Sequence, residues 1–276
     1  MGKTQRKTTQ RSTPRKRKTT EQTLRSKILD HFHTLKIPLD DNEFDAAIGE
    51  PERDGLSHLQ LLDRLLGRQA DERRQRSLER RIREARFAEV KTLEQFDWDF
   101  NAQTIDRSRI EELATGEFIR RGDNLIAVGQ SGVGKSHIFQ ALGRNSCELE
   151  YRVRYTTSAD LLADLSASLA DGTTPRRIRY WAKFDLLIID EFGFDRIERS
   201  RSPEASSLLY KIIDARSPAR STALITNIPF DAWGEYLQDV PLAMALLDRL
   251  VDRAVILQLE GKSYRAARAR TSKKAN

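Results

Sequence analysis

Apolar residues in the second half of the chain fall into two alternating patterns: short continuous runs, and longer stretches with an apolar residue at every third or fourth position. The first pattern is typical of buried strands and the second of helices. Strands that alternate with helices predict a parallel sheet joined by right-handed crossovers. We therefore predict an α/β fold whose five strands lie at residues 125–128, 153–157, 184–189, 222–226 and 255–259.

Helical spacing fills the intervals between the predicted strands. One helix precedes the first strand and ends near Gly122, and another follows that strand and ends near Cys147. A third begins at Ser158, whose hydroxyl can cap it. Two more are predicted over residues 204–216 and 242–253.

The first part of the chain is predicted to be disordered and then helical. Residues 1–20 contain almost no apolar side chain, so they cannot offset the entropy lost on ordering, and we predict a disordered basic tail. Residues 21–66 carry apolar residues with helical spacing, interrupted at Pro38 and at the Asp54-Gly55 turn. This second segment predicts a small all-helical N-terminal domain.

A charged helix and an aromatic linker, residues 67–106, connect this domain to the α/β region. Arginines are frequent over residues 68–91, and two interpretations stay open. The segment is either a DNA-binding arginine helix or a solvated helix whose charges pair four residues apart, as Glu79 and Arg83 can. Three aromatic residues follow, which we expect to anchor the linker on a domain surface rather than to stack on bases: Phe96, Trp98 and Phe100.

Charge is distributed unevenly along the 276 residues. The formal net charge is +7, yet the first 20 residues hold eight basic side chains and residues 262–276 hold six, with no acid in either segment. The body between these basic tails carries a net charge of −7. Basic tails favour nucleic acid, because binding releases counterions from the phosphates. A solubilising tail without a dedicated partner is the alternative.

Composition also bears on the cellular compartment. No apolar run approaches the roughly 18 residues of a membrane span, and the N-terminus lacks the apolar segment of a secretory signal. The single cysteine, Cys147, excludes an internal disulfide, and we expect its thiol to be buried. These features predict a cytoplasmic protein without a membrane partner.

A phosphate-binding motif follows the first predicted strand. It reads G-x-x-x-x-G-K-S from Gly129 to Ser136. Glycines let the backbone approach a polyphosphate, and N–H groups at a helix N-terminus form a nest for anions. Lys135 is placed to reach the β- and γ-phosphates, and the Ser136 hydroxyl to bind Mg²⁺. The predicted nucleotide-binding residues are Gly129, Gln130, Ser131, Gly132, Val133, Gly134, Lys135, Ser136 and His137.

Two acidic residues end the third predicted strand. A continuous apolar run is followed by Asp190 and Glu191. Ligands of open parallel sheets bind at the carboxyl ends of the strands, so Asp190 is placed to hold Mg²⁺ together with Ser136. Glu191 is placed to polarise a water molecule for attack on the γ-phosphate. This pair indicates an ATP hydrolase rather than a small-molecule kinase.

Two further polar positions are candidates for catalysis. Asn227 follows the fourth predicted strand, where it can orient the attacking water or contact the γ-phosphate. Arg249, in the last predicted helix, can act as an arginine finger that reaches the nucleotide of a neighbouring subunit. Arg253 is a rival for this role, and an ion pair of Arg249 with Asp252 is the structural alternative.

Several other motifs accompany the phosphate-binding loop. They lie at residues 91–98, 113–116, 185–193, 232–235, 245–250 and 261–265. From about Leu78 onward, these motifs resemble those of the IstB-like ATP-binding helper proteins of insertion-sequence transposition, relatives of the DnaC and DnaA AAA+ ATPases. The chain departs from the family pattern at Gln130-Ser131, at Ser136 and at Phe192, and none of these changes removes a ligand.

The α/β pattern begins at residue 107, and charge sets apart a basic C-terminal tail over 266–276. The resemblance implies that residues 107–265 are a P-loop AAA+ domain. It implies that Arg249 is the finger acting in trans within a homo-oligomer, and that Arg265 is a second sensor contacting the nucleotide of its own subunit. It also implies an ATPase that assembles on double-stranded DNA and delivers target DNA to a partner transposase. A DnaC-like helicase loader is the alternative, and a DNA-binding scaffold that uses ATP only as a switch is a third interpretation.

Candidates for DNA contact lie in the basic segments. They are the two tails and a short cluster after the predicted helix that begins at Ser158: Arg176, Arg177 and Arg179. No base-reading motif is visible, so we expect contacts to the DNA backbone with little sequence preference.

Overall fold

The chain divides into two compact units, residues 1–77 and residues 78–276. The structure, a computed structural model, describes residues 14–37, 39, 41–54, 57–194, 204–217 and 219–274. The division between the units falls within one long helix. Our predicted domain boundaries at residues 66 and 106 stay predictions.

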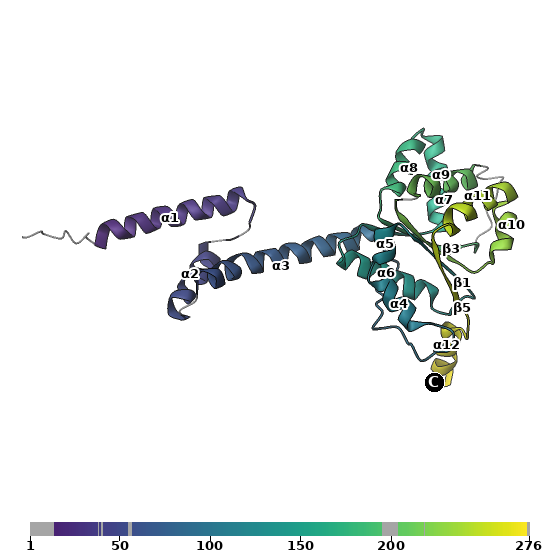
Figure 1. Cartoon of the computed structure of the whole chain (residues 1–276), viewed down its shortest axis with the longest axis horizontal. Helices are drawn as coiled ribbons and strands as arrows, with labels where there is room; N and C mark the ends of the chain where they lie inside the picture. Colours follow the sequence, from purple (N-terminus) through teal and green to yellow (C-terminus); the bar gives the residue numbers. More distant parts are fainter. Residues whose placement is uncertain are drawn as a thin grey trace, which may run out of the picture. The chain divides into compact units, whose positions relative to one another are not determined.

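Three helices supply the first unit: α1 (Pro14–Thr34), α2 (Asp41–Asp54) and the first part of α3 (His58–Ala85) (Figure 1). Phe44 of α2 is buried, and its ring meets Phe32 of α1 with centroids 6.3 Å apart. Arg25 joins the same two helices through Asp45, with 2.8 Å between Nε and Oδ1. An apolar contact and an ion pair therefore hold α1 against α2, in keeping with the predicted all-helical N-terminal region.

Two features of this unit differ from the sequence-based expectations. Helix α1 begins at Pro14, so residues 14–20 of the predicted disordered tail are helical. Proline at the first helical position has no hydrogen bond to lose, and the arginines and lysines that follow are good helix formers. Residues 1–13 lie outside the described residues. Helix α3 joins the last apolar residues of the predicted N-terminal domain and the charged segment after residue 67 into one helix, because Gly67 weakens a helix without ending it.

A parallel sheet of five strands organises the second unit, in the order β2-β3-β4-β1-β5. The strands are β1 (Asn124–Gly129), β2 (Val153–Thr157), β3 (Leu186–Phe192), β4 (Ser221–Thr226) and β5 (Ala254–Leu259). The five predicted strands and the α/β fold are confirmed. No strand end differs from its predicted position by more than three residues.

Alternating side chains of the strands enter two separate cores. Leu125 of β1 packs in one core and its neighbour Ile126 in the other, and Ile188 and Ile189 of β3 divide in the same way. The first core is covered by α4 (Arg107–Ala114) and α6 (Lys135–Glu148). The second is covered by α7 (Ser158–Ala170), α8 (Thr174–Ala182), α9 (Ala205–Arg216) and α11 (Val240–Val251). Burial on both faces explains why the strands are continuous apolar runs.

Short elements complete the unit, and one of them corrects a prediction. The helix predicted before the first strand is two helices, α4 and α5 (Glu117–Arg121), because Gly116 has a left-handed backbone with φ +75°. The predicted C-terminal tail, residues 266–276, is helical as far as Lys274, in α12 (Tyr264–Lys274). The Ser263 hydroxyl accepts from the Ala266 amide at the start of this helix. The remaining short elements are η1 (Phe230–Ala232) and α10 (Trp233–Leu237).

Two buried polar groups stabilise the packing. Cys147 is buried, as predicted, and burial raises the pKa of its thiol to about 12. Arg216, at the end of α9, is 1% exposed. Its guanidinium donates to the Phe184 carbonyl at 2.9 Å, the Trp181 carbonyl at 3.1 Å and the Thr222 hydroxyl at 3.0 Å. It thereby links the end of α8 to β3 and β4.

None of the helices that the structure describes has the length and apolar character needed to span a membrane.

Candidate nucleotide-binding site

The phosphate-binding loop runs from β1 into α6 and requires its glycines. Gly132 and Gly134 have φ values of +85° and +108°, a region that L side chains rarely adopt. A Cβ at Gly132 would also lie 2.2 Å from the hydroxyl of Ser263, and one at Gly134 would lie 2.8 Å from the ring of Phe96. Neighbouring chain segments thus approach the loop so closely that no side chain fits at these positions.

Lys135 occupies the first position of α6 and bridges the loop. It is 7% exposed, and its ammonium group donates to the carbonyls of Gly129 at 2.6 Å and Gln130 at 2.8 Å. Burial lowers its pKa, and the negative charge of Asp190 opposes this shift. An ammonium group has three donors, so one donor stays available for an anion in the cavity.

Asp190 lies near the carboxyl end of β3, lines the cavity and is 3% exposed. Its Oδ2 accepts from the hydroxyl of Tyr155 at 2.8 Å, and its Oδ1 accepts from the amide of Glu191 at 2.7 Å. Tyr155 lies on the neighbouring strand β2, and sequence reasoning did not single it out. A tyrosine in a strand is usually a core residue. Its contact with the carboxylate depends on the pairing of β2 with β3, which the sequence does not indicate.

Glu191 follows directly and takes an unusual backbone conformation, with φ +60°. The pairing of β3 with β4 is irregular between Ile189 and Phe192, on either side of this residue. Such irregularities re-aim side chains next to active sites. The Glu191 side chain is exposed and lines the cavity, although the Asp190 side chain beside it is buried.

A cavity of about 620 Å³ collects most of the predicted site residues. Its lining includes the loop residues Ser131 to Gly134, and also Lys135, Ser136, His137, Asp190, Glu191, Asn227 and Arg265. Gly129 and Gln130 contribute the carbonyls that hold Lys135. The Ser136 hydroxyl and the Asp190 carboxylate are the hard oxygen donors that Mg²⁺ binds beside a triphosphate, so the residues present fit both groups.

The aromatic linker forms another part of the cavity wall. The Phe96 ring contacts Trp98, with centroids 4.8 Å apart, and His137, with centroids 5.2 Å apart. Phe100 contacts Tyr264 of α12 at 5.0 Å. The prediction that these aromatics anchor the linker is confirmed, since Phe96 and Trp98 also pack against the first core. The sequence did not indicate that Phe96 and Phe100 line the cavity.

His137 is held by this linker instead of pointing freely into the cavity. Its Nε2 lies 2.9 Å from the carbonyl oxygen of Thr92. Burial lowers its pKa below the ordinary value of 6.5. The neutral ring with a proton on Nε2 is therefore the form that donates to Thr92.

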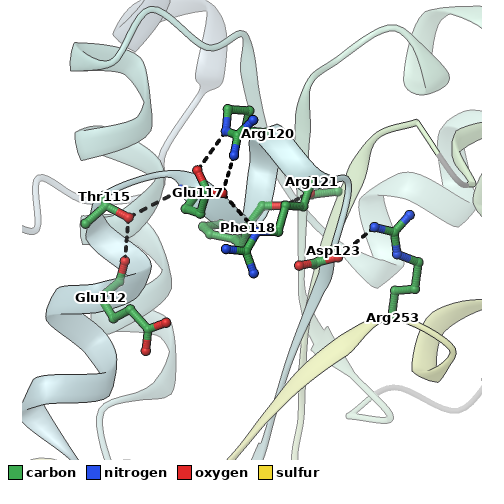
Figure 2. Close-up of polar contacts among 9 residues, drawn as sticks. Glu112, Thr115, Glu117, Phe118, Arg120, Arg121, Asp123 and Arg253 are labelled. Carbon is green, nitrogen blue, oxygen red and sulfur yellow. Dashed lines mark hydrogen bonds and ion pairs between the residues drawn. The ribbon is translucent and has the colours of Figure 1, made fainter.

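The arginine finger candidates lie outside the cavity lining of their own subunit. Arg249 donates from Nε to Oδ1 of Asp214 at 3.1 Å, so its ion pair is with α9 and not with Asp252 as the alternative supposed. Arg253 pairs with Asp123 at 3.4 Å, as Figure 2 shows. Both guanidinium groups are exposed at the surface.

The three arginines proposed for DNA contact are exposed on α8. Arg177 pairs with Asp164 of α7 at 3.4 Å. Figure 1 shows α8 and α12 at opposite ends of the second unit, and none of these three arginines lines the nucleotide cavity.

Comparisons with known proteins agree with this site. Residues 32–274 match the family model described as IstB-like ATP binding protein. The ATP-binding protein of insertion sequence IS5376 from Geobacillus stearothermophilus is 31% identical over 243 residues, which cover 88% of this chain and 94% of that protein. Its counterpart in insertion sequence IS21 from Pseudomonas aeruginosa is 35% identical over 210 residues, covering 76% of this chain and 77% of the relative.

Solved structures share the fold. AMPPCP-bound DnaA from Aquifex aeolicus superposes with a TM-score of 0.51 at 19% identity, over 69% of this chain and 56% of that chain. A crystal structure of DnaI superposes with a TM-score of 0.50 at 17% identity, over 66% of this chain and 93% of that chain.

Proposed function

Because the chain belongs to the family of IstB-like ATP binding proteins, we propose that it is an ATPase that assembles on DNA and assists insertion-sequence transposition by bringing target DNA to a partner transposase. The observation that carries the ATPase proposal is the convergence of Lys135, Asp190 and Glu191 on one cavity. The relatives named for insertion sequences support the biological role.

Each cavity residue has a task in the proposed reaction. Lys135 uses its remaining donor to bind an oxygen of the β- or γ-phosphate, and Ser136 and Asp190 would hold Mg²⁺. The bound cation supplies positive charge that offsets the charge developing on the phosphates. Glu191 accepts a hydrogen bond from the attacking water and orients it toward the γ-phosphate. Asn227 supports the same water or contacts the γ-phosphate.

Arg265 is placed to stabilise the phosphates of its own subunit from α12. Its positive charge also lowers the pKa of Lys135, so the two cations share one region of the cavity. Asp190 offsets part of the positive charge of Lys135, and a triphosphate between Lys135 and Arg265 would interact favourably with both cations. This arrangement supports nucleotide binding as the role of the cavity.

Hydrolysis is tested with Glu191→Gln, which keeps the size of the side chain and removes its charge. We expect ATP to bind with nearly unchanged affinity and phosphate release to fall at least a hundredfold. Glu148→Gln is the matched control, since this exposed carboxylate lies outside the cavity lining. Equal phosphate release by both variants would refute the role of Glu191 and leave ATP binding as a switch.

Assembly is tested by mixing variants. Lys135→Ala subunits keep Arg249 but cannot grip ATP, and Arg249→Ala subunits bind ATP but lack the finger. If Arg249 acts in trans, neither variant hydrolyses ATP alone and their mixture recovers activity. The same mixing with Arg253→Ala identifies the rival finger. DNA binding equal with ATP and with ADP, without assembly in either state, would contradict the proposed assembly.

A further inference from the structure

A small basic hollow lies beside the nucleotide cavity. Its volume is about 230 Å³, and four cationic side chains line it: Arg83, Arg86, Lys91 and Arg144. Glu89 is the acid in this lining, and its carboxylate pairs with Lys91 at 2.7 Å. That pair leaves three arginines of the lining, Arg83, Arg86 and Arg144, without an acid of their own among the residues that line the hollow.

Two other arginines fix the walls of this hollow. Arg81 donates from Nε to the Cys147 carbonyl at 2.9 Å, which attaches the end of α3 to α6. Arg154 of β2 is 7% exposed and donates to the Glu84 carbonyl at 3.0 Å, near the end of the same helix. The left-handed backbone of Arg86, φ +56°, then turns the chain away from α3. Contacts within the second unit therefore hold the walls of the hollow in place.

The arginines along α3 differ in whether they form ion pairs. Arg68 and Arg76 both pair with Glu72, and Arg74 pairs with Asp71. Within the described part of the chain, Arg83, Arg86 and Arg144 have no ion pair. The two interpretations of the arginine-rich segment thus apply to different residues of it: Arg68, Arg74 and Arg76 are paired with acids of α3, and Arg83 is not.

We propose that this hollow binds phosphate groups of the DNA backbone, an inference that rests on the proposed function in DNA-dependent assembly. Guanidinium groups present several N–H donors in one plane, which suits the oxygens of a phosphate. Three arginines around one hollow concentrate positive charge there, and this charge attracts a phosphate. The contact is with backbone phosphates, so it carries no sequence preference.

The hollow and the nucleotide cavity share one wall. Ala88, Glu89, Lys91 and Gln140 line both. The Glu89 amide donates to the side-chain oxygen of Gln140 at 2.9 Å, so the linker is attached to α6 at this wall. Helix α6 begins at Lys135 in the nucleotide cavity and carries Arg144 in the hollow. A displacement of α6 on nucleotide binding therefore moves Arg144 as well. Nucleotide binding in the cavity and phosphate binding in the hollow are coupled in this way.

The test is Arg83→Ala combined with Arg144→Ala, measured by fluorescence anisotropy with a labelled 30-base-pair duplex and AMPPNP over a range of salt concentrations. Each phosphate contact contributes about 0.9 to the slope of log affinity against log salt, so the slope should become shallower by about 1.8. Affinity at low salt should fall at least tenfold, for duplexes of unrelated sequence alike.

The matched control is Arg120→Ala combined with Arg121→Ala. It removes the same net charge from two exposed arginines that both pair with Glu117 (Figure 2). We expect its salt slope to equal that of the unmodified chain. Arg83→Lys combined with Arg144→Lys should keep most of the slope, because this variant keeps both positive charges. AMPPNP binding without DNA and the thermal unfolding midpoint establish that each variant is folded.

The coupling between nucleotide binding and DNA binding supplies a second measurement. Saturating duplex should raise the AMPPNP affinity of the unmodified chain, and by thermodynamic reciprocity AMPPNP should raise the affinity for duplex by the same factor. The Arg83/Arg144 double variant should lose this effect. If that variant matches the Arg120/Arg121 control in slope, the hollow is not a phosphate site, although DNA binding by the chain still stands. If the unmodified chain does not bind duplex at all, the proposed function and this inference fail together.

Discussion

Replacing Tyr155 by phenylalanine removes a single hydroxyl from beneath the nucleotide cavity and leaves the shape of the ring unchanged. That hydroxyl donates to Oδ2 of Asp190 at 2.8 Å, and Asp190 is 3% exposed. Burial and the nearby carboxylate raise the pKa of Tyr155, so the phenol keeps its proton and remains a donor. In the variant, Oδ2 of a buried carboxylate loses this donor.

The magnitude follows from the kind of bond that is lost. Hydrogen bonds to charged groups contribute about 1.5–3 kcal/mol to stability, and a buried acceptor without a partner adds a desolvation penalty. Oδ1 keeps the Glu191 amide, and the Lys135 ammonium group still opposes the charge of Asp190. We therefore expect Tyr155→Phe to lower the free energy of unfolding by about 1.5–3 kcal/mol. For a unit of this size, that corresponds to a fall of about 3–12 °C in the melting temperature.

The stability assay uses the fluorescence of the tryptophans of the chain. Its three tryptophans, Trp98, Trp181 and Trp233, all lie in the second unit. Tryptophan fluorescence during urea denaturation therefore reports the unit that contains Tyr155, whatever the first unit does. The control is Tyr180→Phe, the same chemical change at a tyrosine whose hydroxyl has no hydrogen-bond partner among the described residues.

Two results would refute this reasoning. If Tyr155→Phe and Tyr180→Phe lower stability equally, the hydroxyl does not stabilise the buried carboxylate. If stability falls but the Mg²⁺ concentration needed for half-maximal ATP binding does not change, the hydroxyl stabilises the fold without positioning Asp190 for the cation. We expect that Mg²⁺ requirement to rise severalfold, because a less fixed carboxylate binds less tightly.

Three further changes test other parts of the site. Gly134→Ala should weaken ATP binding at least tenfold in isothermal titration, because the added Cβ would lie 2.8 Å from the ring of Phe96. Gly172→Ala is the control: its backbone φ is also positive, but no atom lies within 4 Å of the added Cβ, so ATP affinity should not change. Lowering the pH below 6.5 should reduce the urea midpoint, because burial lowers the pKa of His137 and the unfolded chain takes up the proton first; His137→Gln should flatten this dependence. Arg216→Met should lower the unfolding free energy by about 3 kcal/mol or more, since it leaves buried carbonyls without donors, and a smaller loss in the fluorescence assay would show that these carbonyls find other partners.

The strands and the loop were predictable because their signals are local. Each strand of the parallel sheet is buried on both faces, so it appears in the sequence as an apolar run, and its side chains divide between two cores. The glycines and Lys135 of the loop are contiguous, as are Asp190 and Glu191. The one assumption needed to place them together was that ligand sites lie at the carboxyl ends of parallel strands.

Helix ends were predicted less well, because they depend on weak and competing local preferences. The left-handed Gly116 divides a predicted single helix into α4 and α5, and Pro14 begins a helix inside a segment whose composition indicated disorder. Alanine and arginine make α12 helical in a segment whose charge alone suggested a tail. In the last two segments, helix propensity outweighs the high charge and low apolar content.

The amino-acid sequence by itself determined the order of strands and helices and the residues that can grip a triphosphate, because those depend on patterns within a few neighbouring positions. Only the tertiary structure decided that Tyr155 holds Asp190, that Phe96 closes the cavity over Gly134, and that Arg144 meets the end of α3. Each of these contacts joins residues from separate strands, helices or loops. Their meeting depends on how the sheet pairs and how the linker packs on it, which no local pattern specifies.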